Sequence, residues 1–162
     1  MSLDYLKELL EEKRVDEALE VVENLTDSQV QGSEKELLQI LTSADDASLR
    51  NSIALRMSDA KCQQVAPCII DLLKDPKTKG NRGTLLYALH ELNYSEHIED
   101  LLPLLADPSF EVSRETYELV RPYFRKLTKM QKNEAKVLLE DYLEDLRDEI
   151  DFRKSILSVL KK

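Results

Sequence analysis

A spacing of 32 residues recurs along the chain and constrains its fold more than any other feature. Three segments align without gaps at this spacing: 36–44 (ELLQILTSA), 68–76 (CIIDLLKDP) and 100–108 (DLLPLLADP). Within each segment, apolar residues lie three and four positions apart, which predicts one apolar stripe along a helix. A period of this length indicates an array of stacked helical units.

A second helix follows each of these segments. Asp75-Pro76 and Asp107-Pro108 mark two of the breaks, because proline disfavours helix in the residue before it. Beyond the breaks Arg50, Arg82 and Arg114 again lie 32 residues apart, and each precedes a second apolar stripe. A single helical pair cannot bury its apolar face alone, so the pairs are expected to stack.

The stacked pairs are expected to form one domain, because 162 residues suffice for one and are few for two. The terminal pairs follow the pattern less closely, as capping units do. Pro122 should end or kink a helix that begins near Glu111. The five expected pairs cover approximately residues 3–26, 34–58, 61–92, 96–125 and 131–161.

The string at 65–92 (VAPCIIDLLKDPKTKGNRGTLLYALHEL) resembles a HEAT repeat, and the segments at 34–57 and 97–120 are similar to it. The resemblance implies an all-α fold, a right-handed α-α superhelix (HEAT/armadillo-like solenoid) of about five helical pairs. It also implies that the three recurring arginines pair with an Asp in the turn of their own or a neighbouring repeat, and are structural.

Charge and composition argue against several function classes. The formal net charge is −9, and residues 1–47 alone carry 13 Asp and Glu against 4 Lys and Arg. This excess argues against general nucleic-acid binding and favours a basic protein partner. The sequence contains no run of 18 or more apolar residues, so no membrane span is expected. The acidic N-terminal stretch does not resemble a secretory signal. A cytoplasmic protein is therefore expected.

No constellation of residues with catalytic or metal-binding spacing occurs. Cys62 and Cys68 are six residues apart, unlike the paired cysteines of a zinc site. His90 and His97 are seven apart, but an expected turn separates them. None of the three glycines begins a phosphate-binding motif. The sequence therefore predicts no catalytic residue, no metal site and no cofactor.

The second helices are the expected binding surface, since in the HEAT family they line the concave face. Leu55 and Tyr87 each lie five residues after a recurring arginine, and together they would suit a peptide-binding groove if exposed. The alternative is that a rotated register buries both. The candidate protein-binding residues at outward positions are Asn51, Leu55, Tyr87, His90, Glu118, Arg121 and Arg125.

The favoured function is a non-enzymatic protein–protein interaction scaffold or adaptor that binds a partner on its concave helical face. One alternative is a HEAT-like enzyme or cofactor-handling protein, lyase-like or DNA-glycosylase-like, whose site the sequence does not reveal. Another is a DNA-binding protein that uses Lys74, Lys77, Lys79 and Arg82. The last 30 residues could cap the array or mediate self-association, so the oligomeric state stays open.

Overall fold

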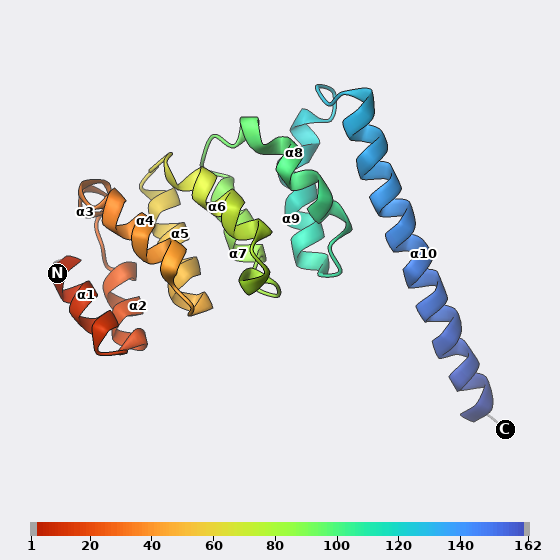
Figure 1. Cartoon of the computed structure of the whole chain (residues 1–162), viewed down its shortest axis with the longest axis horizontal. Helices are drawn as coiled ribbons and strands as arrows, with labels where there is room; N and C mark the ends of the chain where they lie inside the picture. Colours follow the sequence, from red (N-terminus) through yellow and green to blue (C-terminus); the bar gives the residue numbers. More distant parts are fainter. Residues whose placement is uncertain (1–2, 161–162) are drawn as a thin grey trace. The chain divides into compact units, whose positions relative to one another are not determined.

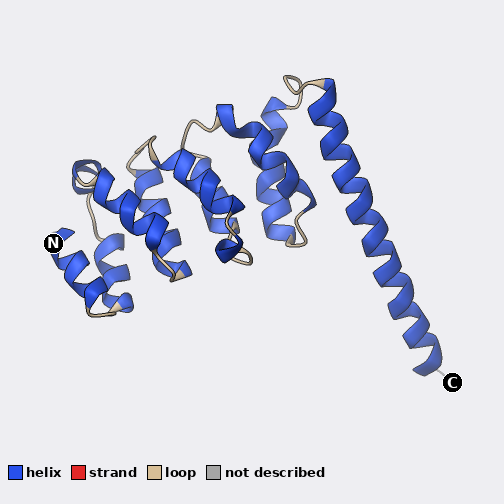
Figure 2. Ribbon diagram, viewed as in Figure 1, coloured by secondary structure: helices blue, strands red, loops and turns tan. Residues whose placement is uncertain are grey.

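The computed structural model describes residues 3–160, and every regular element in that range is helical. Ten α-helices and four short 3-10 helices follow one another, and no strand occurs among the residues described (Figure 2). The expected all-α class, with about ten helices, is therefore confirmed. Within this part of the chain, no helix is both long and apolar enough to cross a membrane.

The chain divides into two compact units, Met1–Ile98 and Glu99–Lys162. Helices α1 and α2, α4 and α5, and α6 and α7 pack as three pairs in the first unit. The α-helices of this unit are α1 (Leu3–Glu11), α2 (Val15–Glu23), α3 (Asp27–Gly32), α4 (Glu34–Ser43), α5 (Ala47–Asp59), α6 (Val65–Lys74) and α7 (Gly83–Leu89) (Figure 1).

Helix α5 is the centre of the first unit, because it packs against both α2 and α7 as well as against its own partner α4. Its inward face is built from Ile53, Ala54 and Met57, all of which are fully buried. The neighbouring first helices α4 and α6 also contact each other. The second helices α2, α5 and α7 therefore lie side by side in one row (Figure 1).

Helix α3 was not expected from the 32-residue pattern. It begins with a capping box. The main-chain N–H of Gln29 donates to the Thr26 hydroxyl, and the main-chain N–H of Thr26 donates to the side-chain oxygen of Gln29. The spacing of Thr26 and Gln29 is a known signal for the start of a helix. Two further 3-10 turns complete this unit, η1 (Pro76–Thr78) and η2 (Ser95–His97).

The second unit contains α8 (Ile98–Leu101), which begins at the unit boundary, η3 (Leu102–Ala106), α9 (Phe110–Val120), η4 (Arg121–Tyr123) and α10 (Lys129–Leu160). Pro103 lies where α8 gives way to η3, so the expected first helix of the fourth pair is split. Helix α9 ends at Val120, two residues before Pro122, which confirms the predicted stop.

The last expected pair, 131–146 and 149–161, is corrected to one continuous helix, α10 (Figure 1). Its first turn is closed by a capping box between Thr128 and Gln131. No glycine or proline occurs from Lys129 to Leu160, so the sequence contains no residue that would break the helix.

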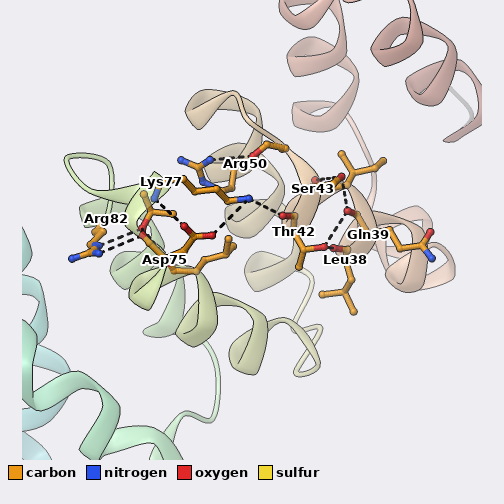
Figure 3. Close-up of polar contacts among 12 residues, drawn as sticks. Leu38, Gln39, Thr42, Ser43, Arg50, Asp75, Lys77 and Arg82 are labelled. Atoms are coloured by element: carbon orange, nitrogen blue, oxygen red, sulfur yellow. Dashed lines mark hydrogen bonds and ion pairs between the residues drawn. The ribbon is translucent and has the colours of Figure 1, made fainter.

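Two of the three recurring arginines, Arg50 and Arg82, bind main-chain oxygens. Arg50 is fully buried, and its Nη1 donates to the oxygen of Ala44 at 3.2 Å. Arg82 donates from Nη2 to the main-chain oxygen of Asp75 at 3.4 Å (Figure 3). The carboxylate of Asp75 instead caps η1 by accepting from the Lys77 amide. For Arg50, the implied pairing with a turn carboxylate is therefore corrected, since its hydrogen-bond partner is a carbonyl.

Candidate functional site

An open groove runs along α5 between α2 and α7, and we call it the α5 groove. It encloses about 500 Å³. Its floor comes from α5, because positions three and four residues apart on one helix share a face. Leu19, Glu23 and Thr84 contribute the flanking walls. The α5 residues that line it are Ser48, Asn51, Ser52, Leu55, Arg56 and Asp59.

Asn51 lies in the floor of the groove and carries an unsatisfied acceptor beneath the surface. Its Nδ2 donates to the main-chain oxygen of Asn81 at 3.5 Å. Its Oδ1 is buried and has no hydrogen-bond partner among the described residues. A buried acceptor without a partner is energetically costly, and because this oxygen is closed to solvent it lies beneath the floor of the groove and is not open to a ligand there.

Arg56 closes one end of the groove and is held from two sides. Its Nη2 donates to the main-chain oxygen of Leu25 at 2.6 Å and to Asp27 Oδ1 at 3.0 Å. Its Nη1 lies 3.5 Å from Asp59 Oδ2. The side chain is 17% exposed, whereas those of Asp27 and Asp59 are mostly exposed. The positive charge is therefore compensated, and the carboxylates still face water.

The rim of the α5 groove carries more acidic than basic side chains. Glu23 on α2 and Asp59 on α5 line it, and Arg56 is the one basic residue among the lining side chains. Asp27 offsets the charge of Arg56 from just outside the groove. Leu19 and Leu55 add apolar surface between these polar groups. Such a surface suits a segment that carries both aliphatic and basic side chains.

Four of the seven candidate residues lie in the first unit. Asn51 and Leu55 line the α5 groove, and Leu55 is half-buried. Tyr87 is 61% exposed on α7, and its ring centroid lies 5.9 Å from that of His90, which is also exposed. A rotated register that would bury both Leu55 and Tyr87 is therefore not observed.

The other three candidates lie in the second unit and do not line the α5 groove. Arg121 Nη2 pairs with Glu118 Oε2 at 2.9 Å, three residues earlier. The Arg121 guanidinium also lies over the ring of Tyr117, 5.8 Å from its centroid. Arg125 is exposed at the end of this segment. These residues form a separate polar surface around α9 and η4.

The sequence analysis missed most of the residues that line the groove. A usable signal was present on α5, because positions 48, 51, 52, 55 and 59 follow the spacing of one helical face. Starting from Leu55, that spacing leads to Ser48, Ser52 and Asp59. No local signal could identify Glu23 or Thr84, since these residues come from other helices.

The loop proposed for DNA binding uses basic groups for internal contacts. Lys77 Nζ donates to the main-chain oxygen of Thr42 at 2.9 Å and lies 4.0 Å from Asp75 Oδ2 (Figure 3). Arg82 Nε donates to the hydroxyl of Thr78 at 3.3 Å. These contacts join the turn after α6 to the end of α4, which is a structural role.

The two cysteine thiols are not activated. Burial raises the pKa of the Cys62 thiol to about 12, with a further contribution from the nearby carboxylate of Glu34. Burial also raises the pKa of the Cys68 thiol, and Asp71 adds to the shift. A thiol must ionise to act as a nucleophile or metal ligand. Among residues 3–160, no group of three or more His, Cys, Asp or Glu side chains is arranged to hold a metal ion.

The groove thus offers hydroxyl groups, carboxylates and aliphatic surface, which are groups that ligand-binding clefts commonly contain. Its lining contains no histidine or cysteine.

Comparisons of the chain with protein-family models, with curated proteins and with solved structures find no matching family, relative or structure.

Proposed function

We propose that this chain is a non-enzymatic interaction module that binds a basic segment of a partner protein in the α5 groove. The observation that carries the proposal is the acidic groove itself, with Glu23 and Asp59 at its rim and Leu19 and Leu55 between its polar groups. Ligand sites are typically concave, with apolar walls and a few oriented polar groups, and the α5 groove has this composition.

The proposed architecture is a right-handed α-α superhelix of the HEAT type, with the α5 groove on its concave face. Polar contacts between residues about 30 positions apart support it. Arg56 binds the oxygen of Leu25, and Ser58 Oγ donates to the oxygen of Ala88 at 2.5 Å. The Asn93 amide donates to Gln63 Oε1 at 2.8 Å. Such contacts between successive units are expected of a stacked repeat.

Each chemical group of the groove has a role in this proposal. The hydroxyls of Ser48 and Ser52, which line the groove, accept hydrogen bonds from N–H groups of the ligand. Glu23 and Asp59 pair with lysine or arginine side chains at the rim, while Leu19 and Leu55 contact their aliphatic stems. Residues 1–47 carry 13 acidic and 4 basic residues. This excess of negative charge would accelerate the encounter with a basic partner.

Selection from a random peptide library displayed on phage, with the full chain as bait, tests this proposal. We expect the enriched peptides to carry net positive charge and at least one aliphatic residue. The affinity of one such peptide for the full chain and its variants is then measured by isothermal titration calorimetry. The substitution Glu23→Lys should weaken binding about three- to tenfold, because it places a like charge at the rim.

Glu11→Lys is the matched control, since it makes the same charge change at an exposed α1 position that does not line the groove. It should reduce only the salt-dependent part of the association rate. Equal losses of affinity for the two variants would contradict binding in the groove. Enrichment of acidic or neutral peptides would contradict the proposed chemistry of the partner.

A further inference from the structure

The C-terminal part of α10, residues 143–160, exposes a regular row of apolar side chains. Leu143 is 57% exposed, Ile150 50% and Leu157 54%, and these three residues lie seven positions apart. Leu146, three residues after Leu143, is half-buried beside them. Single exposed leucines are common on protein surfaces, but a continuous row along one helix marks an interaction site.

The row follows a heptad repeat. Leu143, Ile150 and Leu157 occupy the first core position, called a, of successive heptads, and Leu146 and Arg153 occupy the second, called d. A 3.5-residue apolar period is the pattern of two helices that wind around each other. A single polar core residue can fix register and strand number at a cost in stability, and Arg153 at a d position would act in this way.

We infer that residues 143–160 of α10 pair with the same residues of a second copy of this chain, as a short parallel coiled coil. In this arrangement each core position meets the identical position of the second copy. Leu143, Ile150 and Leu157 would then each be covered by the same residue of the second copy. The surface is thus self-complementary, as a two-fold interface must be.

The charges that border the row select the parallel orientation. Arg147 and Lys154 lie at the e positions, and Glu149 lies at a g position. In a parallel pair each g residue faces the e residue of the following heptad, so Glu149 meets Lys154 of the second copy. An antiparallel pair brings e positions together and would place Arg147 beside Lys154, which is repulsive.

The contacts that these charged groups make within one chain are easily exchanged. Glu149 forms an ion pair with Arg153, and Lys154 forms one with Asp151 at 2.9 Å. All four side chains are at least half exposed, so these pairs contribute little to stability. Glu149 can therefore leave Arg153 for the partner helix, and the charge that Arg153 then brings to the core row lowers the stability of the pair.

The heptad pattern stops where α10 packs on its own unit. The preceding a position is Lys136, and Ala135 nearby is buried. Leu105, Phe124 and Leu139 line an apolar cavity of about 420 Å³ beside this part of the helix. The pairing segment is thus limited to 18 residues, about 27 Å of helix. So short a coiled coil associates weakly and in a concentration-dependent manner.

Sedimentation equilibrium of the full chain measures this association. We expect a monomer–dimer equilibrium, with the dissociation constant raised at least about tenfold by Ile150→Lys. Val159→Lys is the control, because Val159 is 70% exposed but lies outside the core positions. A chain that remains monomeric up to about 200 µM would overturn the inference, as would equal effects of the two substitutions.

Disulfide trapping tests the orientation. Leu143→Cys should form a disulfide-linked dimer under mild oxidation, whereas Glu144→Cys, which faces away from the row, should not. Cross-linking only in a mixture of Leu143→Cys and Leu157→Cys chains would show an antiparallel pair and refute the proposed register. Circular dichroism confirms that each variant remains helical. Peptide binding in the α5 groove is measured separately, so either proposal can fail alone.

Discussion

The Nη2 of Arg56 donates to the main-chain oxygen of Leu25 at 2.6 Å, across 31 residues of sequence. This bond joins the end of α5 to the turn that follows α2. Leu25 is itself buried, so its carbonyl lies in a region with little access to water. A charged donor in that setting forms a strong hydrogen bond, and it holds two neighbouring second helices in place. The wall and the floor of the α5 groove are therefore linked at this point.

Replacing Arg56 by alanine should destabilise the protein by about 1.5–3 kcal/mol, because it removes a charged hydrogen bond to a buried carbonyl. Urea denaturation followed by circular dichroism measures the change. Arg14→Ala is the matched control, since Arg14 pairs with the exposed Glu12 and Glu17. The urea midpoint of that control should not move. Similar midpoints for the two variants would argue against the role of Arg56.

Ser58→Ala should cost about 1–2 kcal/mol, because the buried carbonyl of Ala88 would lose its donor. The loss should appear in thermal unfolding as a lower Tm. Ser43→Ala serves for comparison, since the Ser43 hydroxyl donates within α4 to Gln39 and is exposed. If the two substitutions lowered Tm equally, the contact between α5 and α7 would not be a significant source of stability.

Tyr87→Ala should leave the free energy of unfolding within about 0.5 kcal/mol of the original value, because surface substitutions rarely do more. Tyr94→Ala should destabilise by about 3–5 kcal/mol, since Tyr94 is buried and its ring fills part of the core. Urea denaturation of both variants tests the exposure of Tyr87. A large loss for Tyr87→Ala would place its ring in a packed environment instead.

The Cys62 thiol should react very slowly with iodoacetamide in the folded protein. Its pKa is raised from 9.0 to about 12, so at pH 8 the thiolate population falls about a thousandfold relative to the unfolded chain. In the folded protein the rate should keep rising with pH beyond 9, whereas in urea it levels off there. Peptide mass spectrometry identifies the modified residue. Rapid alkylation of folded Cys62 at pH 8 would contradict the burial of this thiol.

Local sequence signals were sufficient for most of the helices. The apolar stripes of 36–44 and 68–76 depend on residues three and four positions apart, which is the range over which a helix forms. The stop at Pro122 is equally local, since the ring removes a donor and clashes with the preceding turn. The continuity of α10 was also readable, because no residue there interrupts a helix. It was missed because the repeat pattern suggested a fifth pair.

The α5 groove could not be derived in the same way. Leu55 and Tyr87 occupy equivalent positions 32 residues apart, yet one is half-buried and the other is exposed. Their surroundings differ because each helix meets different neighbours. Arg56 likewise binds the main-chain oxygen of Leu25, and Asn51 Nδ2 that of Asn81. Both of these oxygens lie about 30 residues away in the sequence. No periodic pattern specifies which of the polar atoms at such distances will meet.

The sequence by itself thus determined the helical class, the pairing of helices in the first unit and the absence of a recognisable catalytic motif. Tertiary structure decided which polar groups are buried, which main-chain oxygens Arg50 and Arg56 bind and where a cavity opens. The physical reason is the range of the interactions. Helix formation and helix ends follow from neighbouring residues, whereas burial and hydrogen-bond satisfaction are set by contacts that exist only after the helices have packed.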